Sequence, residues 1–169
     1  MNKKKGMVWS MDIIFSVFVF VAAIFLFFEF NSNMMRQDDR IMEDLIYEAR
    51  YISDNLMSEG SPKNWNITDI NAVGIVEDGY RVNMTKVDML SKISYYNLKR
   101  ILGTTNDYYI FFRGSDNTII PINSTLDGIG KEGINSTNIY DSNEAVHVVN
   151  VERVVFYNST IAKMMVYVW

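Results

Sequence analysis

The feature that most constrains this chain is an apolar run near its N-terminus, residues 7–30, which reads MVWSMDIIFSVFVFVAAIFLFFEF. No charged residue occurs between Ile13 and Phe28. As a helix, residues 7–28 are about 33 Å long, enough to cross a hydrocarbon core of roughly 30 Å. We therefore predict a membrane-spanning helix, with Glu29 marking its outer boundary.

The flanks of the apolar run predict its orientation. A secretory signal peptide has an apolar region of roughly 7–15 residues followed by a small-residue cleavage site. Here the run is longer, and the residues that follow, EFNSN, lack a small-x-small pattern. Lys3, Lys4 and Lys5 precede the run, so the positive-inside rule places the N-terminus in the cytoplasm and the rest outside. This topology suits an uncleaved signal anchor and a processed leader equally.

The residues around Gly6 carry a family resemblance. Lys5-Gly6, followed by MVWSMD and an apolar helix, resembles the class III signal of type IV prepilins, especially the archaeal kind. The resemblance implies that a membrane prepilin peptidase cuts after Gly6, so that the mature chain begins at Met7. Ser10 and Asp12 match the serine and the acidic residue of that signal. Asp12 stands one position later than the family norm, with Trp9 as the extra residue.

Asp12 is a carboxylate near the start of the apolar run, where it must meet a cation or become protonated. If the leader is removed, the natural partner is the free amine of Met7, from the same chain or from a neighbouring subunit. Such a pair would remove two charges from lipid and set the axial register between subunits. The plainer alternative places Asp12 at headgroup depth, where it ends the span.

The helical pattern continues beyond the membrane span. Apolar residues recur at spacings of seven and four, which marks one helical stripe: Met34, Ile41, Leu45, Ile52 and Leu56, with Met42 and Ala49 beside them. Gly60 and Pro62 then end the helix. The pattern predicts one helix of about 50 residues. A bend at Asn31-Ser32-Asn33 would instead give an anchor followed by a separate amphipathic helix.

Shorter elements are predicted after residue 60. Strands at 72–76 and 80–82 flank a turn, and helices at 85–93 and 94–102 follow, with Ser94 as N-cap and Gly103 as stop. A hairpin at 107–113 and 118–122, a long surface loop at 123–143 and a last hairpin at 145–157 and 161–169 complete the chain. In the final strand, one face is predicted to cover the amphipathic helix: Ala162, Met164, Val166 and Val168.

These elements predict an α+β fold, a long N-terminal helix packed on a small antiparallel sheet. The resemblance implies the same layout for pilins and pseudopilins. The predicted parts are a leader at 1–6, a membrane or filament-core helix at 7–30, its amphipathic continuation at 31–59 and an extracytoplasmic head at 60–169. The chain has no cysteine, so the head must be held by packing alone.

Catalysis and nucleic-acid binding find little support in the composition. The net charge of -4 argues against a nucleic-acid partner. His147 is the single histidine, interpreted as a half-buried strand residue without a partner for a metal or nucleophile site. The acidic pairs of the amphipathic helix are interpreted as a solvated face: Asp38, Asp39, Glu43 and Asp44. Two loop pairs lack a calcium-ligand spacing: Asp116 with Asn117, and Asp127 with Glu132. No metal, cofactor or enzymatic activity is predicted.

Five sequons of the form N-x-S/T form the second functional signal, where composition alone predicts about two. Each falls in a predicted loop, turn or strand end, so each is a candidate for glycosylation: Asn66, Asn83, Asn123, Asn135 and Asn158. The long loop makes Asn123 and Asn135 the best candidates.

Three hypotheses follow from the sequence. The first is a pilin-like or pseudopilin-like subunit of a cell-surface filament or secretion apparatus, whose partners are the membrane, a prepilin peptidase and other pilin-like subunits. The second is an uncleaved, single-pass membrane-anchored binding or accessory protein. The third, a membrane-anchored enzyme, is the least supported, because no catalytic constellation is present.

Overall fold

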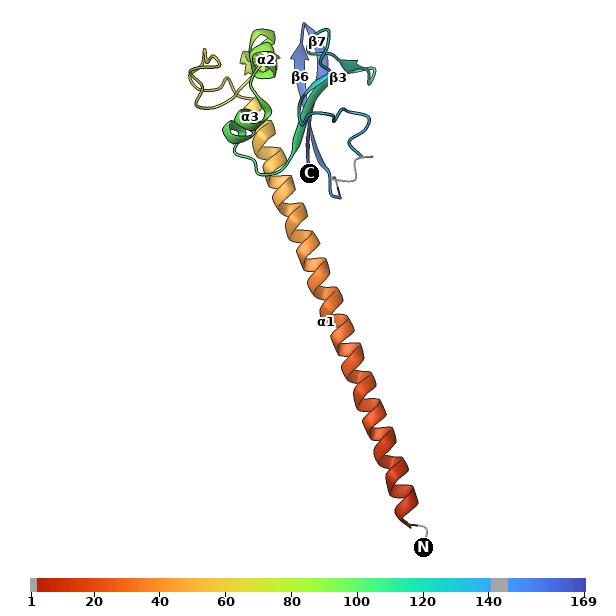
Figure 1. The fold of residues 1–169 in the computed structure, drawn as a ribbon. Helices are drawn as coiled ribbons and strands as arrows, with labels where there is room; N and C mark the ends of the chain where they lie inside the picture. Colours follow the sequence, from red (N-terminus) through yellow and green to blue (C-terminus); the bar gives the residue numbers. More distant parts are fainter. Residues whose placement is uncertain (1–2, 141–145) are drawn as a thin grey trace. The chain divides into compact units, whose positions relative to one another are not determined.

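The computed structural model describes residues 3–140 and 146–169, with side chains for residues 11–35, 38–140 and 146–169 (Figure 1). The chain forms two compact units, Met1–Ile41 and Met42–Trp169. The described part of the first unit is helical throughout. The second unit, called the head below, combines the end of that helix with shorter helices and a sheet, which confirms the α+β layout.

Helix α1 runs from Lys3 to Leu56 and passes through Asn31, Ser32 and Asn33 without interruption. The single long helix is thus confirmed, and the alternative of a break at these residues is wrong. The local reason is composition, because residues 7–56 contain neither glycine nor proline. The helix starts four residues before Met7, inside the predicted leader.

The C-terminal end of α1 is held by backbone and side-chain hydrogen bonds within the head. The carbonyl of Leu56 accepts a hydrogen bond from the Ile75 amide at 3.0 Å. The carbonyl of Glu59 accepts one from the Nζ atom of Lys86 at 2.8 Å. The first bond satisfies a carbonyl group that the helix end leaves without an intrahelical partner, and the second holds the segment that follows the helix.

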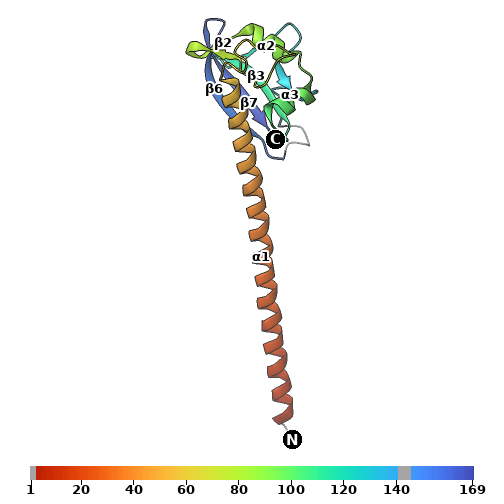
Figure 2. The same ribbon diagram turned by 90° about the vertical axis from the view of Figure 1, so that its left-hand side faces the viewer.

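The apolar stripe that the sequence predicts is buried only over the last turns of α1, because Met34 and Ile41 at its start are exposed. Leu45, Ala49, Ile52 and Leu56 are all buried in the main hydrophobic core of the head. The same core contains the predicted face of the last strand, which is therefore confirmed: Ala162, Met164, Val166 and Val168. Figure 2 shows the end of α1 beside the strands of the sheet.

The sheet is built mainly from antiparallel pairs. Its strands are β1 (Val76–Glu77), β2 (Arg81–Val82), β3 (Tyr108–Gly114), β4 (Ile119–Ile120), β5 (Gly128–Gly130), β6 (Val149–Tyr157) and β7 (Thr160–Val168). The spatial order is β1-β2-β6-β7-β3-β4, and β5 pairs with β3 beside β4. Both predicted hairpins, β3–β4 and β6–β7, are present. The parallel contact between β2 and β6, through Arg81 and Phe156, was not predicted.

The prediction of an irregular loop over 123–143 is wrong in its middle, where β5 pairs with β3; residues 141–143 lie outside the described residues. Glycine is unfavourable in strands, so a glycine-containing segment is normally predicted as a loop. Here the glycines of β5 allow its backbone to lie close to β3. A Cβ atom on Gly128 would lie 2.5 Å from Tyr109, and one on Gly130 would lie 2.2 Å from the Tyr108 carbonyl oxygen. The two glycines are therefore what lets β5 approach β3.

Two other predicted strands start later than expected. The strand predicted at 72–76 is reduced to Val76–Glu77, and Ala72 forms only an isolated bridge to Ser61. The strand predicted at 145–157 begins at Val149, and residue 145 lies outside the described residues. The interpretation of His147 as a strand residue is therefore wrong, although its side chain is half-buried.

Two short helices cover part of the core, α2 (Met84–Ser91) and α3 (Tyr95–Leu102), and a single 3-10 turn, η1 (Asp78–Tyr80), links β1 to β2. Ser94 occupies the N-cap position of α3 as predicted, although its side chain makes no capping bond. Gly103 ends α3 in the left-handed conformation, with φ of 69°. The N-cap of α2 is Asn83, whose side chain accepts from the Lys86 amide.

Candidate functional site

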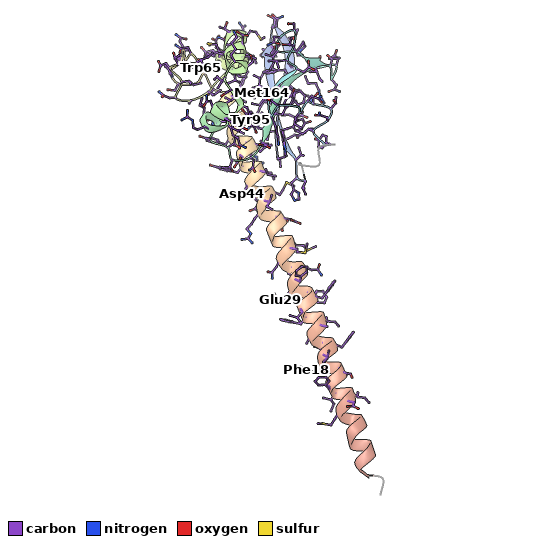
Figure 3. All side chains as sticks on the ribbon, in the orientation of Figure 1. Phe18, Glu29, Asp44, Trp65, Tyr95 and Met164 are labelled. Atoms are coloured by element: carbon purple, nitrogen blue, oxygen red, sulfur yellow. The ribbon has the colours of Figure 1, made fainter. Side chains whose placement is uncertain are left out.

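The candidate assembly surface is the front segment of α1, defined here as residues 11–30. Every large apolar side chain in this segment is exposed, the least exposed being Ile24 at 39%. Figure 3 shows Phe18 and Glu29 pointing outwards from the helix. The helix has the length and apolar composition needed to cross a membrane, and no residue of its most apolar window is buried within the protein. The segment therefore presents an apolar surface on all sides.

Two polar side chains in and next to the front segment, Ser16 and Asn31, donate hydrogen bonds to backbone carbonyls of the helix itself. The hydroxyl of Ser16 donates to the Asp12 carbonyl at 2.8 Å. The side-chain amide of Asn31 donates to the Phe27 carbonyl at 3.0 Å. Such bonds one turn back along a helix leave fewer polar groups to solvate. An apolar environment is thus compatible with both residues.

Asp12 is exposed, and no described side chain pairs with its carboxylate. Helical spacing places Asp12, Ser16 and Val19 on one face of the front segment. The predicted processing residues, Gly6 and Met7, lie within α1, but their side chains fall outside the described set. The structure therefore places an exposed carboxylate, Asp12, at the start of the apolar surface.

Polar contacts also fasten the end of α1 within the head. Glu48 accepts hydrogen bonds from the hydroxyls of Thr104 and Thr105, in the loop between α3 and β3. Asp54 forms an ion pair with Arg153 of β6, with a nitrogen–oxygen distance of 2.6 Å. The remaining acidic residues predicted to form a solvated face are exposed, as expected: Asp38, Asp39, Glu43 and Asp44.

Asp107, at the entrance to β3, is the centre of a charged cluster that the sequence did not reveal. Its two carboxylate oxygens accept hydrogen bonds from Lys99 at 2.9 Å and Lys131 at 2.6 Å, and the hydroxyl of Tyr95 donates to it at 2.6 Å. Partial burial opposes ionisation, but the hydrogen bonds from Lys131, Tyr95 and Lys99 together hold the pKa of Asp107 well below its usual range.

The partners of Asp107 come from α3 and from the residue after β5. The sequence predicts these segments as a helix and a loop and does not predict a contact between them. Burial, together with the bond to Asp107, raises the pKa of the Tyr95 hydroxyl above its ordinary value. No signal in the sequence pairs these residues. The cluster joins α3, β3 and the residue after β5 through three hydrogen bonds to one carboxylate, so we assign it a structural role.

Three further features of the described head concern metal ligands, an acidic turn residue and a surface groove. No group of three or more potential metal ligands occurs in the described part of the chain. Asp116 accepts hydrogen bonds from the hydroxyl and amide of Thr118, which lower its pKa and stabilise the β3–β4 turn. A groove of about 610 Å³ beside the β6–β7 turn is lined by Glu77, Arg81 and Phe156 among others, without a nucleophile and base in contact.

Scans against protein-family models, curated proteins and solved structures found no match to this chain.

Proposed function

We propose that this chain is a type IV pilin-like or pseudopilin-like structural subunit of a cell-surface filament or of a secretion or adhesion apparatus. The observation that carries the proposal is the single unbroken helix α1. Its front segment exposes apolar surface except at Ser16 and its two carboxylates, and its last turns are buried in the core of a small α+β head. The chain acts as a building element in this proposal, not as an enzyme.

The exposed apolar surface of residues 11–30 needs a covering. Soluble monomers rarely expose a contiguous apolar patch of more than a few hundred Å². A lipid bilayer covers such a helix before assembly, and the helices of neighbouring subunits cover it afterwards. Both environments suit a segment whose backbone is fully hydrogen-bonded and whose Ser16 hydroxyl bonds back to the helix.

Asp12 gives the packed helices a register. Removal of the lysine leader after Gly6 by a prepilin peptidase would free the amine of Met7, which then pairs with the Asp12 carboxylate of a neighbouring subunit. A charge buried among apolar helices without such a partner is costly, so only the register that pairs the two groups is stable. The head remains on the outer side of the membrane.

One observation favours the second candidate, an uncleaved membrane-anchored accessory protein. Helix α1 begins at Lys3, so the helix includes Gly6 and the predicted cleavage point has no break in it. A retained leader would leave Lys3, Lys4 and Lys5 as a cytoplasmic anchor. The two candidates agree on topology and differ in the N-terminal residue of the mature protein.

N-terminal sequencing and intact mass of the protein from membranes of a host with a prepilin peptidase separate the two candidates. We expect a chain that begins at Met7, and a chain that keeps its leader after Gly6→Val. A wild-type chain that begins at Met1 would overturn the processing step and support the accessory-protein candidate.

The assembly role of Asp12 has a matched control in Glu29, the other carboxylate of the front segment. Asp12→Ala should abolish recovery of the subunit in sheared filaments while leaving its amount in the membrane unchanged. Glu29→Ala should assemble normally. Normal filaments from Asp12→Ala, or equal loss from both variants, would refute the proposed pairing.

A further inference from the structure

Three of the five sequons adopt the same hydrogen-bonded turn. The Oδ1 atom of Asn66 accepts from the Thr68 amide at 2.9 Å and from the Thr68 hydroxyl at 2.6 Å. Asn123 accepts from the amide and hydroxyl of Thr125, both at 2.9 Å. Asn135 accepts from the amide and hydroxyl of Thr137 at 2.9 and 2.7 Å. In each case the backbone amide three residues after the asparagine donates to the same Oδ1 atom.

These bonds fix which side of each amide faces the protein. A carboxamide is planar, so an Oδ1 atom held against its own turn directs the Nδ2 atom away from that turn. Among the described residues, the Nδ2 atoms of Asn66, Asn123 and Asn135 donate no hydrogen bond to the protein. Asn66 and Asn135 are exposed, and Asn123 is half-buried. All three lie in loops of the head and none lies on α1.

The other two sequons are arranged differently. The Oδ1 atom of Asn83 caps α2 by accepting from the Lys86 amide at 3.1 Å, and its Nδ2 atom donates to Glu77 at 2.6 Å. Asn158 lies in the β6–β7 turn with φ of 47°. The hydroxyl of Thr160 there donates to the Tyr157 carbonyl at 2.8 Å and not to the asparagine. Neither sequon combines an oriented Oδ1 atom with a free Nδ2 atom.

We propose that Asn66, Asn123 and Asn135 are N-glycosylation sites of the folded head, and that Asn83 and Asn158 are not. The Nδ2 atom forms a bond to the anomeric carbon of a sugar carried on a lipid phosphate, and the bond from that carbon to the phosphate oxygen breaks. The lipid phosphate leaves with the electron pair, and one amide proton passes to a base of the transferase. The sequence motif is the same at all five sites, so the selection comes from the fold.

The arrangement places two of the sites close together. A single surface hollow is lined by both Thr125 and Asn135, so Asn123 and Asn135 lie on the same side of the head, beside β5. Asn66 lies in a separate loop between α1 and β1. Sugars at these positions cover loop surface of the head. This modification in the cell rests on the external position of the head in the proposed function.

The test compares the folded chain with its own fragments. Full-length protein in detergent and five synthetic peptides of equal length, each centred on one sequon, are incubated with a membrane oligosaccharyltransferase and a lipid-linked oligosaccharide. Mass spectrometry of tryptic peptides gives the occupancy at each site. We expect all five peptides to react, whereas the folded chain reacts at Asn66, Asn123 and Asn135. Modification at Asn83 should be roughly tenfold slower in the folded chain than in its peptide, because its hydrogen bonds must break first.

A variant tests the physical cause. Glu77→Ala removes the acceptor that holds the Nδ2 atom of Asn83, so occupancy at Asn83 in the folded chain should rise by about threefold or more. Modification of folded Asn83 or Asn158 at the rate of their peptides would overturn the proposal, as would a lack of modification at the three predicted sites. Because the reaction is carried out on purified protein, either result is independent of membrane topology and of leader processing.

Discussion

The front and the end of α1 are both helical and both rich in apolar residues, yet their side chains have opposite surroundings. Phe18, in the front segment, is 70% exposed, whereas Ile52, near the end of the helix, is 0% exposed. The front segment is apolar all round, and the last turns are apolar on one face and charged on the other. The apolar face at the end of α1 needs only one surface to pack against, and the core of the head provides that surface.

This difference shows that the pattern of apolar residues along a helix specifies how many of its sides must be shielded from water. The last turns of α1 need covering on one side only, and the core of the head, which includes β7, covers that side within the same chain. The front segment needs covering on every side, and no described element of its own chain does so. In the proposed function, lipid or neighbouring helices supply this covering.

The largest expected effect comes from truncating equivalent apolar side chains in the two regions. Ile52→Ala should lower the free energy of unfolding of the head by about 3 to 5 kcal/mol, because it opens a cavity in a fully buried site. Phe18→Ala should change it by less than about 0.5 kcal/mol. Urea denaturation of the full chain in detergent measures both. Similar losses from the two variants would abolish the distinction between the regions.

A charge introduced into each region should have its larger effect in the front segment, the reverse of the apolar truncations. Val21→Arg places a cation in the middle of the apolar run, at a cost of about 3 kcal/mol for membrane insertion. Tyr47→Arg adds the same charge to a residue of α1 that is already exposed. Membrane fractionation should show reduced retention of Val21→Arg alone, and denaturation should show little change in the head for either variant. Full membrane retention of Val21→Arg would place the anchor elsewhere.

The smallest expected effect concerns charge pairing, since Asp107 of the head is paired with Lys99 and Lys131, whereas no described side chain pairs with Asp12 in the front segment. Asp107 has a depressed pKa, so it contributes stability above its unfolded pKa of about 3.9 and loses it as the pH falls through its lower folded value. Asp107→Asn should therefore destabilise the head by about 1 kcal/mol at pH 7, allowing for solvent screening, and by less at pH 2.

Denaturation at a series of pH values measures this effect. The control is Asp127→Asn, which changes an exposed carboxylate in the loop before β5. A stability difference between wild type and Asp107→Asn that does not shrink on acidification would show that the Lys99 and Lys131 contacts add nothing through charge.

Much of the head could be predicted because its signals are local. Asp107 to Arg113 is a run of β-branched and aromatic residues, and it forms β3 with a shift of one residue. Asn158 and Ser159 adopt positive φ values that suit a two-residue hairpin turn, which aligns β6 with β7. Gly103 ends α3 because only glycine enters the left-handed region at low cost.

What the sequence alone determined is the long helix, its all-round apolar front, its one-sided apolar end and the strand face that covers that end, because these depend on residue type and periodicity. The tertiary structure decided the placement of β5 against β3, the convergence of Lys99 and Lys131 on Asp107, and the use of Asn83 as a helix cap. Each of these joins segments or groups through close approach and hydrogen-bond geometry. Such contacts leave no period in the sequence, because they depend on where the folded backbone brings distant residues together.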